Sequence, residues 1–486
     1  MITFLGGIVL LIVGYFTYGK YVERVFGVQE KRPTPAFVNS DGVDYVPMNT
    51  RKNALIQLLN IAGVGPIFGP IMGALYGPVA FLWIVFGAIF AGAVHDYLTG
   101  MISIRNRGAH IPELAERFFG SFMKHIVNAF SLLLLVLVGT VFVSAPADLL
   151  YNLMNGKVAL VILVSIIFAY YVLATLLPID KIIGRFYPFF GILLVLSALG
   201  VGIGLIVKGA PIPELTLENM HPGGVAIFPL LFLTISCGAL SGFHATQSPI
   251  ISRTTESEGE GRKIFYGMMI AEGVIAMIWA AAGMSLFHGQ ELNDILANGG
   301  PAVVVSKVAT TMLGAVGGTI AILGVIILPI TSGDTAFRSA RMIVADYFKI
   351  PQKKMTSRLW IALPMFAISA VLLQIDFTLL WRYFSWANQS TAVIALFIGA
   401  MYLYIDRRNY WIALLPGTFM LMAVTTYILN MPIGFGLPAD ISQILAAMIT
   451  AVLVVLFFYA ARRARNQNTP LEEDISNFQL AQPVIR

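Results

Sequence analysis

Hydrophobic residues are arranged along the chain in long blocks, and short polar segments separate the blocks. An apolar block of about 20 residues is long enough to cross the hydrocarbon core of a bilayer as a helix. The pattern predicts an all-α polytopic membrane protein with about 13 transmembrane helices. The predicted spans, numbered one to thirteen, are 1–19, 54–76, 78–104, 122–146, 157–177, 186–208, 225–250, 264–288, 303–331, 357–374, 383–405, 409–430 and 437–460.

The composition agrees with this class. The chain is 58% hydrophobic and 12% charged, whereas a soluble protein has about 25% charged residues. The first span, MITFLGGIVLLIVGYFTYGK, lacks a basic leader and a small-residue cleavage site. We therefore expect it to remain in the protein as an uncleaved span and not to act as a signal peptide.

Basic residues alternate with the spans. Of the 31 Lys and Arg residues, 27 lie in the segments after odd-numbered spans or in the C-terminal tail. The other four are Lys157, Lys208, Lys307 and Arg382. The positive-inside rule then places the N-terminus outside and the C-terminus in the cytoplasm. Because topology accounts for the net charge of +6, we expect no nucleic-acid partner.

No extramembrane segment is long enough to form a second domain. We expect a single transmembrane domain over 1–465 and a cytoplasmic tail over 466–486. Its predicted parts are the first span with a cytoplasmic loop (1–53), a first repeat (54–208), a second repeat (225–405) and additional spans (409–461).

Span seven begins as an apolar helix and then turns polar. It reads LTISCGALSGFHATQSPIISRTT over 233–255. A lipid-facing helix does not tolerate glycine-rich polar backbone at this depth, because each unpaired group in lipid costs several kcal/mol. We therefore predict a discontinuous helix that lines a site. The alternative is a tightly packed helix interface, which also favours small residues.

Span two contains the second interruption, in ALIQLLNIAGVGPIFGPIMGALYG. Gly63, Gly65 and Pro66 crowd its middle and should break the helix. The two interrupted spans lie five apart and run in opposite directions across the membrane. This arrangement predicts an inverted 5+5 repeat made of spans two to six and seven to eleven.

The two predicted breaks suggest where a substrate would bind. Free backbone amides at half-helix ends would hold a carboxylate near the midplane of the bilayer. The predicted substrate-binding residues are Asn60, Gly63, Gly65, Ser241, Gly242, His244, Thr246 and Gln247, together with Asn388 and Gln389 of span eleven.

Ionisable residues inside the spans are scarce, and each one is therefore a candidate functional group. His95 and Asp96 are adjacent in span three, His244 lies in the break of span seven, and Glu272 lies in span eight. We expect these groups to carry the coupled proton. For His95 and Asp96 a local hydrogen-bonded pair is the alternative, for His244 a neutral core histidine, and for Glu272 pairing with an interfacial Lys or Arg.

Span nine carries a further set of polar residues near its inner end. Asp334 is a fifth proton-coupling candidate, although Arg338 stands four residues later and favours a plain ion pair on one helix face. The hydroxyl oxygens of Thr331 and Ser332 would suit a hard cation such as Na⁺.

Common catalytic, nucleotide-binding and metal-binding motifs are missing from the sequence. The chain has no Walker loop, no nucleophile elbow and no HExxH or Cys/His metal spacing. Its histidines are scattered singly, so neither an enzyme nor a firm metal site nor a cofactor is expected. The expected partners are the lipid bilayer, a small-molecule substrate and a coupling ion.

Several long motifs resemble the carbon starvation protein A (CstA) family. They are CGALSGFHATQSPIISRTT, GRKIFYGMM and AEGVIAMIWAAAG on either side of Ile270, LNIAGVGPIFGPIMGA, WIVFGAIFAGAVHDY, LPITSGDTAFRSARMIVADY and FSWANQSTAVIAL. The resemblance covers most of the chain, which looks like a short member. It implies an inner-membrane transporter linked to carbon starvation, related to peptide uptake and in some relatives to proton-coupled pyruvate uptake. It also implies the LeuT-like fold of the amino acid/polyamine/organocation superfamily.

Together these observations predict a secondary active transporter that imports peptides, amino acids or pyruvate-like carboxylates. The absence of an ATP motif favours ion coupling, and H⁺ is favoured over Na⁺. The alternative is a membrane-embedded nutrient sensor or a channel without coupled transport.

Overall fold

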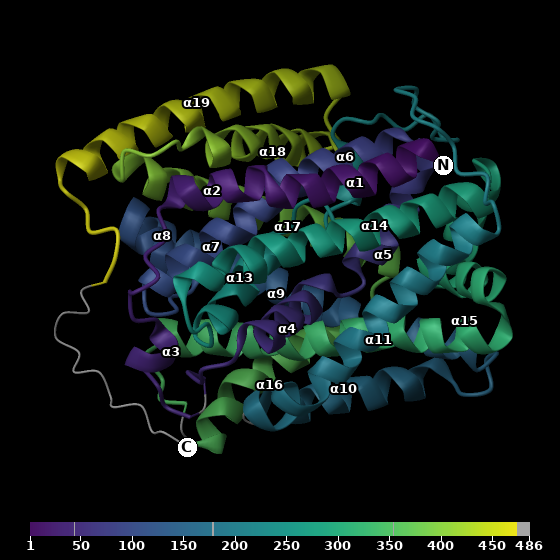
Figure 1. Ribbon diagram of the computed structural model, residues 1–486, viewed down its shortest axis with the longest axis horizontal. Helices are drawn as coiled ribbons and strands as arrows, with labels where there is room; N and C mark the ends of the chain where they lie inside the picture. The colour runs from purple at the N-terminus through teal and green to yellow at the C-terminus, as the bar shows by residue number, and fades with distance from the viewer. Residues whose placement is uncertain (43, 177–178, 353, 474–486) are drawn as a thin grey trace.

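The computed structural model describes residues 1–42, 44–176, 179–352 and 354–473, with the side chains of 176 and 179–189 excluded. Helices pack side by side along one long direction (Figure 1), and no strand occurs among these residues. The prediction of an all-α polytopic membrane protein is confirmed. Of the predicted tail 466–486, residues 474–486 lie outside the described part of the chain.

The first half of the chain forms helices of very different length. They are α1 (Ile2–Phe16), α2 (Tyr18–Phe26), α3 (Pro35–Val38), α4 (Thr50–Ala62), α5 (Gly65–Gly73), η1 (Ala74–Tyr76), α6 (Val79–Gly87), η2 (Ala88–Gly92), α7 (Ala93–Arg105), α8 (Ile111–Phe119), α9 (Ser121–Leu153), α10 (Leu160–Leu176) and α11 (Ile179–Val207).

The second half continues the bundle. Its helices are α12 (Leu230–Thr234), α13 (Gly242–Ser252), η3 (Glu258–Glu260), η4 (Arg262–Tyr266), α14 (Gly267–Leu286), α15 (Gln290–Tyr347), α16 (Met355–Leu372), α17 (Phe377–Ile405), α18 (Trp411–Asn430) and α19 (Ala439–Asn466). The segments η2 and η4 are single π-helical turns, and each leads directly into the helix that follows it.

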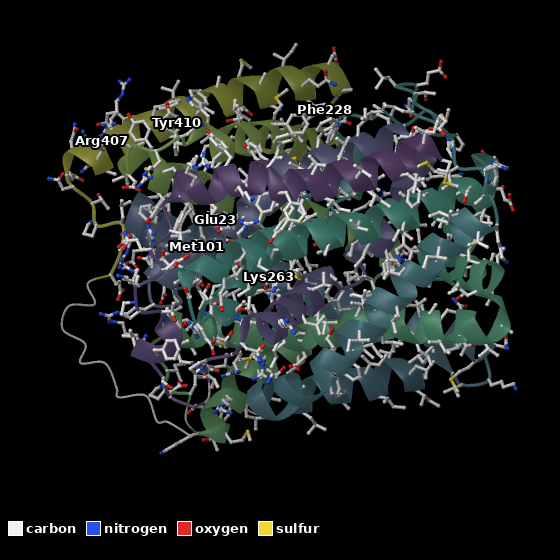
Figure 2. All side chains as sticks on the ribbon, in the orientation of Figure 1. Glu23, Met101, Phe228, Lys263, Arg407 and Tyr410 are labelled. Carbon is white, nitrogen blue, oxygen red and sulfur yellow. The ribbon has the colours of Figure 1, made fainter. Side chains whose placement is uncertain are left out.

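Within the described residues, ten helices are long and apolar enough to span a membrane, or eleven if the bent pair α4 and α5 is one span. The apolar helix Leu160–Thr175 is shorter than these, and the two pieces of predicted span seven are shorter still. The predicted count of thirteen stays a prediction. Large apolar side chains such as Ile2, Trp360 and Val455 are each at least 67% exposed. Figure 2 shows carbon-rich side chains along the outer flanks of the bundle.

Predicted span nine, 303–331, is much shorter than the helix that contains it. The helix α15 has 58 residues and is interrupted only at Gly300 and Gly314, whose φ angles are 69° and 72°. Arg338 and Arg341, assigned to a loop by the sequence pattern, lie inside this helix and are only 1% and 3% exposed. Their charge marks the end of the apolar block but not the end of the helix.

Both predicted breaks are present. The helix α4 ends at Ala62, α5 begins at Gly65, and the two are bent by 47°. Gly63 has a φ of 41°, which favours glycine, and proline stands in the first turn of α5. In the second break, residues 235–241 connect α12 to α13, and Gly238 has a φ of 84°. The relation of the two halves by an inverted repeat stays a prediction.

The connections gather at two opposite ends of the bundle. At the end that we call the basic end, Met48 forms a bridge with Thr255, and Arg105 pairs with Glu258. These contacts join the segments after predicted spans one, three and seven. Figure 2 shows Arg407 at this same end, beside the C-terminal segment.

The other end carries the N-terminus. The amino group of Met1 lies 2.5 Å from a carboxylate oxygen of Glu214, in the segment after predicted span six. This hydrogen bond lowers the pKa of Glu214 to about 2, and bonds from Thr3 add to the effect. Met220 N donates to Tyr76 O, at the end of predicted span two. The segments after predicted spans one, three and seven therefore lie at one end, and those after spans two and six lie at the other.

Candidate functional site

The break before α13 lies against α17, and this contact explains two of the predicted polar residues. Asn388 Oδ1 accepts hydrogen bonds from Phe243 N at 2.7 Å and Ser241 Oγ at 3.2 Å. Gln389 Nε2 donates to Ser236 O at 3.1 Å and Leu240 O at 2.8 Å. The two amides thus pair backbone groups that the break removes from regular helix.

The glycines of the breaks lie in tight contacts with protein. A Cβ on Gly242 would collide with the backbone of Asn388 and Ala392 in α17. A Cβ on Gly65 would collide with the side chain of Cys237. Close helix approach therefore accounts for these two glycines, and their predicted contact with substrate stays a prediction.

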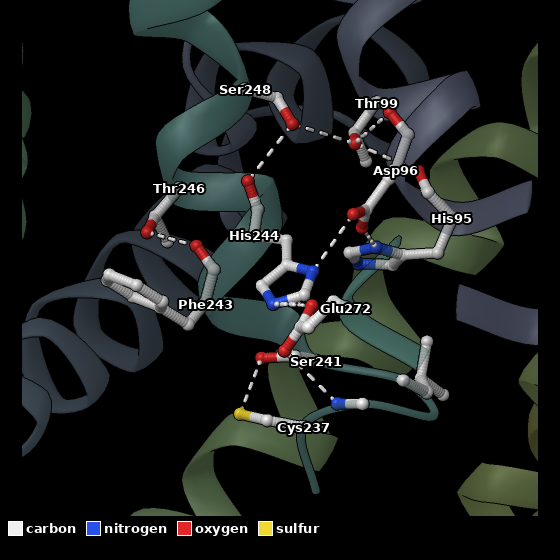
Figure 3. A network of polar contacts seen from close by, with 12 residues as sticks. His95, Asp96, Thr99, Cys237, Ser241, Phe243, His244, Thr246, Ser248 and Glu272 are labelled. Carbon is white, nitrogen blue, oxygen red and sulfur yellow. Dashed lines mark hydrogen bonds and ion pairs between the residues drawn. The ribbon is translucent and has the colours of Figure 1, made fainter. Parts of the chain in front are cut away.

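Four ionisable side chains from three helices form one buried chain at the start of α13 (Figure 3). Asp96 Oδ1 lies 2.8 Å from His95 Nδ1, and Asp96 Oδ2 lies 2.9 Å from His244 Nδ1. On the far side of the ring, His244 Nε2 lies 3.3 Å from Glu272 Oε2. All four side chains are 0% exposed. We call this set the acid–histidine chain.

Two carboxylates flank the imidazole ring of His244 in the acid–histidine chain. If ionised Asp96 accepts from Nδ1–H of His244, then a neutral His244 presents a lone pair at Nε2. An ionised Glu272 would face that lone pair without a hydrogen between them. A proton on Nε2 or on Oε2 removes this conflict, because one of the two facing atoms, 3.3 Å apart and without another hydrogen-bond partner, then carries a hydrogen.

The surrounding contacts hold the acid–histidine chain in place. Gly238 N, in the break itself, donates to Glu272 Oε1 at 3.1 Å. The hydroxyl groups of Thr99 on α7 and Ser248 on α13 lie 3.2 Å apart, and Thr99 also bonds to the backbone oxygen of His95. If Glu272 gains or loses a proton, the change therefore takes place directly beside the backbone of the break.

The break after α4 lies against α15. Gly63 N donates to Ser332 Oγ at 3.2 Å, and Ser332 Oγ donates to Leu59 O at 2.8 Å. Thr331 Oγ1 donates to Leu328 O at 2.8 Å, within α15. The structure thus brings one of the two candidate Na⁺ ligands, Ser332, to the break and keeps both hydroxyl groups in hydrogen bonds.

Asp334 is separate from the acid–histidine chain. It lies 3.5 Å from Arg338 of the same helix, in the i,i+4 arrangement that the sequence favours. Arg338 also donates to Ala174 O at 2.8 Å. Asp334 is therefore part of a buried ion pair within α15, and Arg338 connects this pair to α10.

Buried amide groups near the first break lack protein partners. The side-chain nitrogen and oxygen of both Gln57 and Asn60 form no hydrogen bond, although both residues are 0% exposed. Gln247 Nε2 donates to Thr246 Oγ1 and Ser339 Oγ, but its Oε1 has no partner. Sequence analysis did not select Gln57, although it stands three residues before Asn60, on the same helix face.

Cys237 lies beside the acid–histidine chain. Its Sγ, His244 Nε2 and Glu272 Oε2 all lie within 4.8 Å of one another. The thiol donates to Ser241 Oγ at 3.4 Å.

Comparison with known families gives a match along most of the chain. Carbon starvation protein CstA matches residues 1–168, 152–297 and 290–427. An uncharacterized membrane protein of Haemophilus influenzae is 47% identical over 352 residues, which are 62% of this chain and 95% of that protein.

Two relatives with named functions are more distant. Peptide transporter CstA of Bacillus subtilis is 25% identical, over 85% of this chain and 88% of its own length. Pyruvate/proton symporter BtsT of Escherichia coli is 28% identical, over 57% of this chain and 48% of its own length. The match to BtsT thus covers about half of that protein.

Among solved structures, a mutant of the manganese transporter of Eremococcus coleocola covers 85% of this chain and 94% of its own. The TM-score is 0.57 at 14% identity, which shows a shared membrane-transporter fold and nothing about the cargo. The family and its named relatives are transporters and not enzymes. By the extent of the family match, this chain belongs to the carbon starvation protein CstA family.

Proposed function

We propose that this protein is a proton-coupled secondary active transporter that imports small nutrients across the inner membrane under carbon starvation. The observation that carries the proposal is the acid–histidine chain at the break before α13. One carboxylate oxygen of its last member, Glu272, lies 3.3 Å from His244 Nε2, and the other accepts a hydrogen bond from Gly238 N of the break at 3.1 Å.

Loss of the shared proton would act on the break electrostatically. Glu272 would then face the lone pair of His244 in a site without solvent contact, where an unpaired charge costs several kcal/mol. A rearrangement that hydrates Glu272 or separates it from α13 relieves this cost. Because Gly238 belongs to the break, the rearrangement moves backbone that lines the proposed substrate site.

The predicted substrate lies near the two breaks. Gln57 and Asn60 offer neutral amide donors and acceptors that have no protein partner, and Gln247 offers an acceptor, Oε1, that has none. Such groups suit a carboxylate or a peptide group equally. The named relatives include peptide transporters and a pyruvate/proton symporter. We therefore propose peptides, amino acids and pyruvate-like carboxylates as the substrate class.

The proposed coupling ion is H⁺. His95, Asp96, His244 and Glu272 form the route, and Asp334 is the weakest candidate because it pairs with Arg338. Na⁺ at Thr331 and Ser332 is the second candidate, favoured by the position of Ser332 at the first break.

We also propose that the basic end faces the cytoplasm and that the N-terminus lies outside. The concentration of Lys and Arg after odd-numbered spans supports this orientation. The contacts among these segments at one end of the bundle agree with it.

The test is uptake by purified protein in proteoliposomes, with pH and Na⁺ gradients imposed separately and a panel of labelled peptides, amino acids and pyruvate. Concentrative uptake driven by an inward proton gradient and abolished by a protonophore is the expected result. Uptake driven only by Na⁺ would transfer the coupling to Thr331 and Ser332. Ligand binding without concentrative uptake would support the alternative, a nutrient sensor or a channel.

A further inference from the structure

A cavity of about 1070 Å³ opens at the basic end. Its wall includes residues 106–109 between α7 and α8, Arg253 at the end of α13 and Asp346 near the end of α15. Residues 469, 470, 472 and 473, which follow α19, complete the wall. We call residues 469–473 the strap.

The strap is fixed to the connection after α7 by its backbone. Glu473 N donates to Arg105 O at 3.2 Å, and Asn106 Nδ2 donates to Leu471 O at 3.2 Å. The helix α19 lies along the flank of the bundle, and the chain turns back from its end toward α8 and α7 (Figure 1). The strap therefore docks on a part of the bundle distant from it in sequence.

Two carboxylates of the strap meet four arginines. Glu472 pairs with Arg32 and, at 3.0 Å, with Arg105. Glu473 lies 2.7 Å from Arg107 and 3.1 Å from Arg117. Charge-assisted contacts of this kind are about twice as strong as neutral hydrogen bonds.

The four arginines come from three different segments. Arg32 precedes α3, Arg105 and Arg107 lie at the end of α7, and Arg117 belongs to α8. The helix α7 packs on α13 and α17, whereas α8 packs chiefly on α9 and α9 on α15. Glu473 thus links the end of α7, which packs on α13, to α8, which packs on α9.

Buried Glu258 already pairs with Arg105 and lies 3.8 Å from Arg32. We propose that Arg32, Arg105, Arg107 and Arg117 also bind the carboxylates of the strap, and that the strap is a releasable latch over the cavity. The side chains of Glu472 and Glu473 are 26% and 34% exposed. Water and ions reach these pairs, so the latch opens at a low cost compared with a fully buried pair.

The test measures access to the cavity and needs no substrate. Ala109 lines the cavity, and the single native cysteine, Cys237, is only 3% exposed. In Ala109→Cys protein in detergent, a bulky charged maleimide should label slowly. Adding Glu472→Gln and Glu473→Gln should raise the labelling rate about tenfold, because the strap loses its charge-assisted contacts.

The matched control is Glu116→Gln. Glu116 lines the same cavity and pairs with Lys124 at 2.5 Å, but it is not part of the strap. This variant should leave the rate within about twofold of the parent, because an exposed pair contributes little. An equal increase in both variants would indicate a general charge effect and would overturn the latch.

Salt provides a second measurement on a chain with intact strap carboxylates. About 1 M NaCl reduces the screening length to about 3 Å. It should accelerate labelling of Ala109→Cys, and should not accelerate it further when Glu472→Gln and Glu473→Gln are also present. Unchanged labelling in well-folded double-variant protein, with or without salt, would also overturn the proposal. Because labelling requires no uptake, a negative result here leaves the proposed transport function separately testable.

Discussion

At the scale of single residues, the acid–histidine chain was only partly predictable. Each of its members stands out in the sequence as an ionisable group inside an apolar span. Their meeting was not predictable, because the contact of α7, α13 and α14 depends on packing between distant segments. The orphan amide of Gln57 illustrates the same limit, since its lack of a partner exists only in three dimensions.

The proposed sharing of a proton between His244 and Glu272 predicts the effect of Glu272→Gln. A glutamine keeps the size of the side chain but cannot exchange a proton with His244. We expect proton-driven uptake to fall by at least about tenfold, while substrate exchange at equal pH on both sides continues. Asp148→Asn is the control, because Asp148 is also an acid in an apolar helix, α9, but does not belong to the acid–histidine chain. Full proton-driven uptake in Glu272→Gln would exclude the assignment.

The orphan amides make a prediction in which stability and uptake change in opposite directions. Gln57→Leu removes two buried polar atoms that have no protein partner. It should raise the free energy of unfolding by about 1 kcal/mol and reduce substrate uptake strongly. Gln389→Leu is the contrast, because Gln389 makes two hydrogen bonds and its loss should lower the melting temperature. A Gln57→Leu protein that is less stable would indicate a structural role for Gln57.

At the scale of elements, helix-breaking residues predicted both interruptions. The glycines and prolines of spans two and seven disfavour continuous helix whatever surrounds them. The partners that stabilise the interruptions were not predictable in the same way. Asn388 and Gln389 were expected to face the substrate, and in the structure they bond to the broken backbone. The predicted length of α15 was too short, because its buried arginines follow the apolar block and were therefore assigned to a loop.

Close packing at the second break predicts different effects for two glycine substitutions. Gly242→Ala should lower the melting temperature by several degrees and reduce the yield of folded protein, because a Cβ meets the backbone of α17. Gly6→Ala in α1 has open space around it and should stabilise the helix by about 0.5–1 kcal/mol. Thermal unfolding of both purified variants provides the comparison, and equal stability in the two would contradict this packing.

At the scale of the whole molecule, the membrane-protein class was predictable, and so was the placement of the described connections at two opposite ends of the bundle. Both follow from the length of apolar blocks and the position of basic residues, which depend on the bilayer and not on detailed packing. Span boundaries were less predictable, since α15 continues 16 residues past the predicted end at 331.

Orientation is tested with two exposed positions at opposite ends. Glu218→Cys lies in the connection after α11, and Asn409→Cys lies between α17 and α18. In intact cells an impermeant maleimide should label the first, and should label the second only after permeabilisation. Buried Cys237 should contribute little background. The opposite pattern would reverse the topology, and labelling of both from outside would exclude the alternation.

The π-helical turns η2 and η4 have a consequence for insertions and deletions. Each one precedes a helix of the acid–histidine chain, η2 before His95 and Asp96 on α7 and η4 before Glu272 on α14. A π turn holds one residue more than an α turn. Removing that residue would rotate the following helix by about 100° and turn its ionisable groups away from α13. The spacing of residues along these two helices is therefore as restrictive as their identity, and single-residue deletions there should be far more damaging than in the surface connections.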